Sequence, residues 1–516
     1  MPSGAILPGG RGRSQAAPGA GWALALLIGI NLFNYIDRQI LAATLPKIRL
    51  DATIFRPDDP YVRTKLGALT TAFMVAYTLL SPVFGRLGDT MRRWAIVGMA
   101  VLLWSLATGG TGLATGYMVM FLTRCLVGIG EAAYGPVAPA MLSDLYPADH
   151  RGRVMSWFYM AIPVGSALGF VIGSQVGEVL GWRWAFFVAV LPGMALGALC
   201  FFMREPPRPT TTATPNAPDT PDAKEVKKPR YRDVLRELKG TRSFVLCCAG
   251  MTASTFVLGG VATVMQLYLF EREARFTMSE EAVKELDKLK DSDGGRVVPP
   301  PVIDKIKAAT WEPNVSYSDF KAKMREVLSE HEFTLYSSWA FDKAPAEGSL
   351  TNGTIGLYLG CIVVVSGLLA TLLGGMLGDW LTNRGLKGAY FHVIGWSMLA
   401  GFPFFLAMLY VPFPLGWGLL FVAVFLLFFN TGPANTILAN VTRSNIRATA
   451  FAVNIFVIHA LGDAISPPII GLIADKVDFH TAFLGVSFLI PVSAVLWIMG
   501  ARYLDEDTKK ANESVG

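Results

Sequence analysis

The fold of this chain is decided by a stretch that occurs twice, as GRLGDTMRR at residues 85–93 and as GMLGDWLTNR at residues 375–384. Each copy follows an apolar run long enough to form a membrane helix, at matching places in the two halves of the chain. Glycines let two helices approach closely, and an aspartate interacts favourably with a neighbouring helix N-terminus. A single GxxGD string is a weak signal, but its repetition predicts two similar halves that share one kind of turn.

Apolar runs of membrane-spanning length extend outward from both copies. A hydrocarbon core of about 30 Å needs roughly 20 apolar residues per helix. Charged residues make up only 16% of the chain, whereas a soluble chain has about 25%. We therefore predict an all-α membrane protein of about twelve spans in two six-helix bundles, with helices near 22–46, 66–86, 94–113, 116–140, 153–177, 184–203, 243–270, 353–377, 390–410, 415–437, 449–473 and 480–502.

The segments between these runs complete the expected domain organisation. It comprises a tail at 1–21, a first bundle at 22–203, a linker at 204–242, a second bundle at 243–502 and a tail at 503–516. Residues 231–239, at the end of the linker, can form a short helix on the membrane surface or remain a solvated segment. An insertion at 272–350 is too long for a bare loop. The sequence leaves open whether it is a small helical subdomain or a disordered lid.

Positive charge predicts the orientation in the membrane, because Lys and Arg concentrate in cytoplasmic loops. The arginines of the two repeated stretches, those near 151 and 447, and the basic linker all fall on one side. Both termini are therefore expected in the cytoplasm and the insertion outside, with the protein integral to an inner or plasma membrane. We expect contacts that lock one conformation on the cytoplasmic side, from Gly85, Gly88, Asp89, Arg92, Arg93, Asp379, Arg151 and Arg447.

Four further strings lie in the expected helices: NYIDR at 34–38, RCLVGIGEA at 124–132, FYMAIPVGS at 158–166 and HALGDAISP at 459–467. With the repeated turn, the chain resembles the major facilitator superfamily, and these strings resemble its Spinster family. The resemblance implies two bundles that rock about a central site. It also implies export of lysophospholipids or sphingolipid phosphates, coupled in several members to protons.

Ionisable residues inside a span cost about 2.5–3.5 kcal/mol each on insertion scales, so each needs a reason to be there. Arg124 and Glu131 are seven residues apart on one helix, which is too far for a direct pair. Counting about 1.5 Å per residue from the outer end of each helix places Arg124 within reach of Asp37. We expect Arg124 to present its planar fork to an anionic head group, and the alternative is a permanently bridged structural arginine.

The buried carboxyl of Glu131 is our first candidate for carrying a proton, and Asp37 is the second. The alternative for Glu131 is a structural carboxyl neutralised by a neighbouring Arg or hydroxyl. His459 and Asp463 stand four residues apart, so they can share one helix face and a proton. A lone buried histidine is usually only packed, but the paired aspartate favours a role in coupling.

Three aromatic residues and one further arginine complete the expected substrate contacts: Tyr35, Arg38, Phe158 and Tyr159. Arg38 cannot share a face with Asp37, because adjacent helical residues point about 100° apart. The aromatic side chains can line a path for an acyl chain. The charged site is therefore expected on the first and fourth helices, with His459 contributed by the eleventh.

These residues predict a secondary transporter and not an enzyme. The five histidines are scattered without ligand spacing, so we expect no metal and no cofactor. The expected partners are an amphiphilic lipid with a charged head group, protons and the bilayer. We expect a monomer and no nucleic-acid partner. The alternative function is transport of small organic anions or drugs, since the superfamily turn says nothing about substrate.

Overall fold

The structure is a computed structural model that describes residues 18–56, 59–146, 148–205, 231–289, 296–443 and 446–513. Within these ranges, twelve helices are long and apolar enough to cross a membrane, so the predicted number of spans is confirmed. The helices of the first half are α1 (Ala20–Leu50), α2 (Val62–Thr90), α3 (Arg93–Gly112), α4 (Tyr117–Leu145), α5 (Ala148–Val179) and α6 (Trp182–Cys200).

The second half contains the other six spans, three of which are interrupted. The uninterrupted helices are α8 (Arg242–Glu273), α13 (Asn352–Asn383) and α14 (Ala389–Tyr410). The tenth span joins α15 (Leu415–Leu427), the 3₁₀ turn η1 (Phe428–Asn430) and α16 (Thr431–Asn440). The last two spans are α17 (Arg447–Ile458) with the π turn η2 (His459–Asp463) and α18 (Ser466–Lys476), then α19 (Phe479–Ser487) with α20 (Leu489–Gly500).

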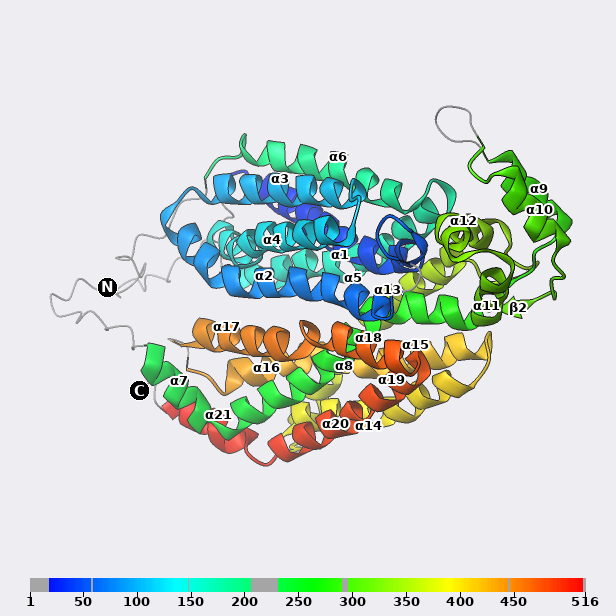
Figure 1. Ribbon diagram of the computed structural model, residues 1–516. Helices are drawn as coiled ribbons and strands as arrows, with labels where there is room; N and C mark the ends of the chain where they lie inside the picture. Colours follow the sequence, from blue (N-terminus) through cyan, green and yellow to red (C-terminus); the bar gives the residue numbers. More distant parts are fainter. Residues whose placement is uncertain are drawn as a thin grey trace, which may run out of the picture.

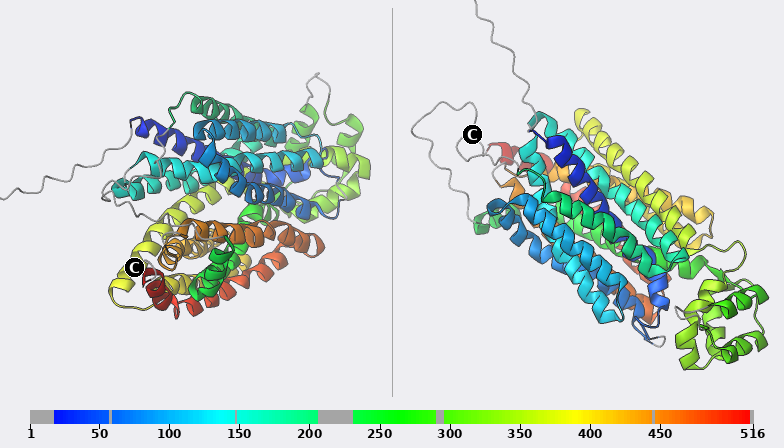
Figure 2. Two further views of the ribbon diagram at one scale, coloured as in Figure 1. Left: turned by 90° about the vertical axis from the view of Figure 1, so that its left-hand side faces the viewer. Right: turned by 90° about the horizontal axis from the view of Figure 1, so that it is seen from above.

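The two halves form two helix bundles that lie side by side (Figure 1). In the first bundle α1 packs on α5, and α3 packs on both α4 and α6. Between the bundles, α13 packs along α5 and α18 along α2. The last helix of the chain lies at one end of the molecule, called here the terminal end, and the insertion lies at the other, the insertion end (Figures 1 and 2).

The insertion is a small helical subdomain, which decides between the two possibilities that the sequence leaves open. It contains β1 (Arg275–Phe276), α9 (Glu280–Lys288), α10 (Pro300–Ala308), β2 (Val315–Ser316), α11 (Tyr317–Val327) and α12 (Glu330–Lys343). The two short strands pair antiparallel. Phe276 of β1 packs with Phe320 and Phe341 in a buried aromatic core. Serine N-caps start α9, α11 and α12, the last with a capping box between Ser329 and Glu332.

Two further helices lie at the terminal end. The end of the linker forms α7 (Tyr231–Gly240), whose Val234 and Leu238 are buried. This confirms the short helix there, while the earlier part of the linker, at 206–230, lies outside the described residues. The expected tail at 503–516 is instead largely helical as α21 (Leu504–Glu513). Its Asp507 accepts a hydrogen bond from the backbone N–H of Ser243, so α21 is attached to the second bundle.

The repeated stretch lies mainly on helices and not in a turn, which corrects the predicted bounds. Helix α2 continues to Thr90 and α13 to Asn383, so only the last residues of each copy leave the helix. The apolar runs end earlier because helices continue beyond the hydrocarbon into polar surroundings. A Cβ on Gly88 would lie 2.7 Å from Val137 Cγ2, and one on Gly378 would lie 2.5 Å from the Tyr390 ring. The glycines therefore allow the close helix packing that the sequence predicts.

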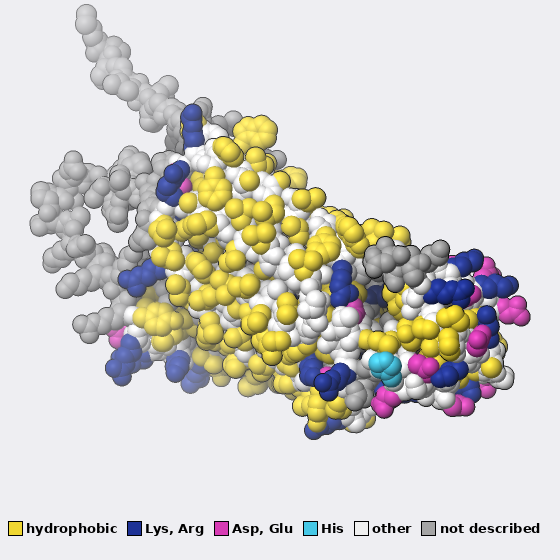
Figure 3. Space-filling model, turned by 45° about the horizontal axis from the view of Figure 1, so that its top comes forward, with side chains coloured by type: hydrophobic (Ala, Val, Ile, Leu, Met, Phe, Trp, Pro, Cys, Tyr) yellow, Lys and Arg dark blue, Asp and Glu magenta, His cyan; other side chains and the backbone are white. Residues whose placement is uncertain are grey.

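The outer surface is apolar between two charged ends (Figure 3). Large side chains such as Leu79, Leu106, Leu191 and Leu372 are more than half exposed. A soluble protein rarely exposes so much contiguous apolar surface. The exposed leucines therefore face lipid, as expected for an integral membrane protein.

Candidate functional site

The centre of the molecule contains an ion pair that joins α1 to α4. Arg38 Nε donates to Glu131 Oε2 at 2.6 Å, and Arg38 Nη2 lies 2.6 Å from the same oxygen. The Glu131 side chain is fully buried, while that of Arg38 is 17% exposed. The other carboxylate oxygen of Glu131, Oε1, is buried without a hydrogen-bond partner. A buried carboxylate with a free oxygen is costly, so its ion pair is the main interaction that holds it charged.

Aromatic rings surround the guanidinium of this pair. The Arg38 guanidinium carbon lies 4.9 Å from the ring centres of Tyr35 and Phe73 and 5.2 Å from that of Tyr77. Cation–π contacts of this kind stabilise a positive charge where water is scarce. Arg38 therefore keeps favourable contacts even if Glu131 releases it.

One of these aromatic side chains, Tyr77, contacts the second half of the protein. The ring of Tyr77 lies edge-on to that of His459, with centroids 6.1 Å apart. His459 Nδ1 lies 3.0 Å from both carboxylate oxygens of Asp463, which confirms the predicted pairing. Both residues belong to the π turn η2, which widens the helix at this point. A line of polar and aromatic groups thus runs from Glu131 through Arg38 and Tyr77 to His459.

Asp37 and Arg124 form a second layer inside the first bundle. Arg124 Nη2 lies 4.0 Å from Asp37 Oδ1, so the predicted pairing is confirmed at the limit of an ion pair. Thr108 donates to Asp37 Oδ2 at 2.5 Å, and Arg124 donates to Thr111 at 2.9 Å. Arg124 is only 2% exposed and lies over the Phe186 ring. Every partner that the structure gives it belongs to the first bundle, so Arg124 does not reach the space between the halves.

The predicted aromatic contacts fall into two groups. Phe158 is 3% exposed, and its backbone carbonyl accepts a hydrogen bond from Asn31. Tyr159 is 49% exposed and packs edge-on against Phe158. Position therefore favours Tyr159 and Tyr35 for contact with a bound molecule, whereas Phe158 is a packing residue.

The two halves are joined at the insertion end by ion pairs. Arg49 of α1 and Arg63 of α2 both pair with Glu271 of α8, Arg63 at 2.8 Å. Arg63 also donates to the carbonyl of Ala474 in α18 at 2.8 Å. We call these residues the insertion-end latch: Arg49, Arg63, Glu271 and Ala474.

Three further contacts between the two bundles lie at the insertion end. A Cβ on Gly67 of α2 would overlap the carbonyl oxygen of Pro467 in α18. Thr71 donates to the carbonyl of Ala464 at 2.5 Å, and Asn352 donates to that of Ala43 at 3.2 Å. These contacts hold the two bundles together at the insertion end.

At the terminal end, the residues predicted to lock a conformation contact partners within their own halves. Buried Arg93 pairs with Asp144 and donates to the carbonyl of Gly88 at 3.1 Å. Asp379 accepts a hydrogen bond from Tyr390 at 2.8 Å. Arg92 and Arg447 are exposed. The side chains of Asp89 and Arg151 lie outside the described residues, and Gly85 packs 3.5 Å from Pro136 as judged by an added Cβ.

Sequence reasoning missed the partners that come from other helices. The Arg38–Glu131 pair joins residues 93 positions apart, and Arg63 and Glu271 are 208 apart. Tyr77 and Phe73 stand four residues apart on α2, a spacing that places both on one helix face. That spacing was the available signal, but aromatic residues are common throughout this chain.

In the parts of the chain that the structure describes, no group of three His, Cys, Asp or Glu side chains is placed to hold a metal ion. The central side chains can instead bind an anion at Arg38, and can hold a proton at Glu131 or at the His459–Asp463 pair.

Comparisons with known proteins agree with this architecture. A family model described as Major Facilitator Superfamily matches residues 27–281. Protein spinster homolog 3 of Danio rerio is 29% identical over 510 residues, 95% of this chain and 86% of that protein. Protein spinster homolog 1 of Homo sapiens is 29% identical over 510 residues, 95% of this chain and 82% of that protein.

A solved structure extends the likeness to three dimensions. It is a bacterial homolog of the human lysosomal transporter Spinster, in an inward-facing and unoccupied conformation. Its TM-score is 0.68 at 16% identity, over 96% of this chain and 99% of that one. This likeness shows the fold, and together with the curated relatives it confirms the resemblance predicted from the short strings.

Proposed function

Because the chain is a major facilitator superfamily transporter that resembles the Spinster family, we propose that it exports lysophospholipids or sphingolipid phosphates by alternating access, coupled to protons. In this proposal the terminal end faces the cytoplasm. The insertion-end latch is then the closed external gate, and the central site is open toward the cytoplasm. The basic residues at the terminal end support this orientation.

The observation that carries the proposal is the Arg38–Glu131 pair in its aromatic surroundings. A guanidinium forms bidentate hydrogen bonds with phosphate as well as with carboxylate. A lipid phosphate at Arg38 therefore competes with Glu131 for the same donors. A buried carboxylate that loses its cation is strongly disfavoured unless it takes up a proton. Head-group binding at Arg38 and protonation of Glu131 are thus linked.

The surrounding side chains suit an amphiphile better than a small hydrophilic anion. Tyr35, Phe73 and Tyr77 line the guanidinium, and half-exposed Tyr159 extends the apolar surface. These rings can pack against an acyl chain while Arg38 holds its charged head. The His459–Asp463 pair, in contact with Tyr77, provides a second proton-binding group in the opposite half.

The experiment is transport by the purified full chain in proteoliposomes. Labelled lysophospholipid and sphingolipid phosphate should cross faster than in empty vesicles, and the rate should depend on the sign of an imposed pH gradient. The sign of the pH gradient that accelerates transport distinguishes cotransport with protons from exchange against them. Transport no faster than in empty vesicles, under either gradient, would refute the proposal.

A binding measurement tests the substrate class against the alternative of small organic anions or drugs. Lysolipid should compete with a labelled lysolipid probe, whereas hydrophilic anions at equal concentration should not. Displacement by the hydrophilic anions alone would favour the alternative.

A further inference from the structure

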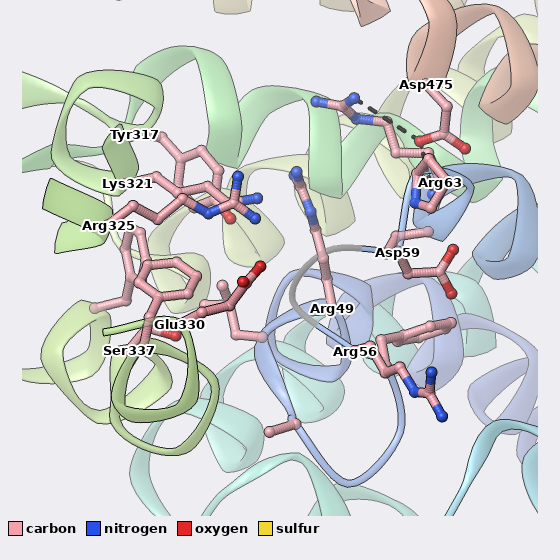
Figure 4. Close-up of a pocket in the computed structure, with 17 residues that line it drawn as sticks. Arg49, Arg56, Asp59, Arg63, Tyr317, Lys321, Arg325, Glu330, Ser337 and Asp475 are labelled. Carbon is pink, nitrogen blue, oxygen red and sulfur yellow. Dashed lines mark hydrogen bonds and ion pairs between the residues drawn. The ribbon is translucent and has the colours of Figure 1, made fainter. Parts of the chain in front are cut away.

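A second cationic site lies beside the insertion-end latch, where the subdomain meets α1 and α2. It is a cavity of about 340 Å³. Its charged lining comprises Arg49, Arg56, Asp59, Arg63, Lys321, Arg325, Glu330 and Asp475. Figure 4 shows Arg49, Lys321 and Arg325 reaching into the same space, with Glu330 beside them and Asp475 next to Arg63. We call it the junction pocket.

Two of the three lining carboxylates are already occupied by other groups. Asp475 accepts hydrogen bonds from the backbone N–H groups of Arg63 and Thr64 at 3.0 and 2.7 Å. Asp59 pairs with Lys65 and accepts from the N–H of Tyr61 at 3.0 Å. Glu330 is the third carboxylate. Among the described residues, no ion pair joins Glu330 to Arg49, Arg63 or Lys321. The acidic side chains therefore leave positive charge in the pocket uncompensated.

The cations of the pocket have too few anionic partners. Arg49 and Arg63 share the carboxylate of Glu271, and Arg63 Nη1 also lies 3.9 Å from Asp475 Oδ1. Lys321 is partly buried, and no hydrogen bond or ion pair to its ammonium group is found among the described residues. Burial, together with the positive charges of Arg49, Arg325 and Arg63, lowers the pKa of Lys321 to about 7. These charges repel one another unless an anion lies between them.

Unmatched buried polar atoms at the same place also indicate a ligand. The Tyr317 hydroxyl is on a side chain only 5% exposed and has no hydrogen-bond partner. Arg63 Nε is likewise buried without a partner. Buried polar groups are nearly always hydrogen-bonded. A hydroxyl donor and a guanidinium donor beside unpaired Lys321 are the groups that bind phosphate oxygens.

We propose that the junction pocket is a binding site for a tetrahedral oxyanion of the phosphate class, bound between Lys321 and Tyr317 of the subdomain and Arg49 and Arg63 of the first bundle. The anion is either free phosphate or the phosphate head group of a lipid. It links the insertion to α1 and α2 beside the insertion-end latch. This site is separate from Arg38 and does not depend on the proposed substrate.

Calorimetry on the full chain in detergent tests the site, with inorganic phosphate and lysophosphatidic acid as separate probes. Binding of both supports a site for the shared phosphate group. Binding of the lipid alone identifies a head-group site, provided that it survives in the Arg38→Gln variant. Binding of neither, or lipid binding that Arg38→Gln abolishes, would overturn the proposal.

Substitutions on one helix locate the site. Lys321→Met removes the charge with little change in size and should weaken phosphate binding about tenfold. Lys323→Met is the matched control, because Lys323 pairs with Glu326 outside the pocket at 3.0 Å and should leave affinity unchanged. Tyr317→Phe, which keeps the ring in the aromatic core, should weaken binding by a smaller factor. Equal affinity in wild type, Lys321→Met and Tyr317→Phe would refute the assignment.

Discussion

The central site and the junction pocket both hold arginines, but they differ in the balance of charge. At the centre, Arg38 is matched by Glu131 and His459 by Asp463. At the junction, Arg49 shares Glu271 with Arg63, which also pairs with Asp475, and Lys321 has no ion-pair partner among the described residues. A matched pair can exchange its partner for a substrate or a proton. An unmatched cluster instead needs an anion from outside.

The largest effect is expected from Arg38→Gln, which unbalances the central site. Removing one partner of a buried ion pair costs about 3–5 kcal/mol, because the other charge is left uncompensated. Transport of labelled lysolipid in proteoliposomes should fall to the level of empty vesicles. Arg38→Lys keeps the charge but loses the planar fork, so it should retain only part of the activity. Transport by Arg38→Gln at the wild-type rate would show that the centre does not bind the head group.

The next effect is expected at Gly67, which decides whether the insertion end can close. Gly67→Val places side-chain atoms against the backbone oxygen of Pro467, which cannot rotate away. Spin labels on α2 and α18 at this end should report a longer distance, and transport should slow. Gly485→Ala is the control, because nothing lies within 4 Å of a Cβ there. Unchanged label distances in Gly67→Val would mean that this contact does not hold the end closed.

Glu271→Gln should leave the junction pocket with more uncompensated positive charge. Among the described residues Glu271 is the one carboxylate that pairs with Arg49. The free energy of unfolding should therefore fall by roughly 1–3 kcal/mol, which lowers the melting temperature. Added phosphate should recover more stability in this variant than in the wild type, because Arg49 and Nη2 of Arg63 then lack the carboxylate of Glu271 and can bind the anion. Thermal unfolding with and without phosphate measures both effects. A smaller phosphate effect in Glu271→Gln would contradict the comparison.

The junction pocket should also respond to pH. Since the pKa of Lys321 is lowered to about 7 from its usual value, its protonated form destabilises the fold below pH 7. This destabilisation is full below about pH 7 and declines as the pH rises from about 7 toward 10.5, the ordinary pKa of lysine, because only the folded state loses the proton over that interval. Sulfate, whose charge is constant in this range, should therefore bind several-fold more weakly at pH 8 than at pH 6.

The control for this pH dependence must account for every charged group in the pocket. Lys321 shares the pocket with the cations Arg49, Arg56, Arg63 and Arg325 and the carboxylates Asp59, Glu330 and Asp475. In Lys321→Met the sulfate affinity should be low and flat between pH 6 and pH 8. A slope equal to that of the wild type would assign the titration to another group.

The smallest effect is expected in the inner layer of the first bundle. Thr108→Val removes the hydrogen bond to Asp37 while keeping the side-chain shape. The free energy of unfolding should fall by about 1–2 kcal/mol, whereas transport per folded molecule should stay close to wild type. A variant as stable as the wild type but inactive in transport would instead place Asp37 in the coupling mechanism.

Much of the fold could be predicted because it is encoded in local patterns. Apolar runs reveal the spans, and the repeated GxxGD stretch reveals the two halves. The spacing of His459 and Asp463 predicted their contact, and counted depth predicted that of Asp37 with Arg124. The ends of α2 and α13 were predicted too early because these helices continue beyond the apolar residues that mark them.

The remaining contacts depend on how helices rotate and pack, which local spacing does not contain. The depth of a residue along its membrane helix did not reveal that Arg38 turns toward Glu131, or that Arg124 points into its own bundle. The partners of Glu271 come from two other helices far away in the sequence. The contacts of Arg124 favour a role in positioning Asp37, and its role as a head-group ligand stays a prediction.

The most direct test of the central claim is transport by Glu131→Gln, which mimics a permanently protonated carboxyl without its charge. Exchange of labelled for unlabelled lysolipid at equal pH should continue, because Arg38 is then free to bind the head group. Accumulation driven by a pH gradient should be lost, because no proton can bind or leave at position 131. Gradient-driven transport at the wild-type rate in Glu131→Gln would contradict the proposed coupling between Arg38 and Glu131.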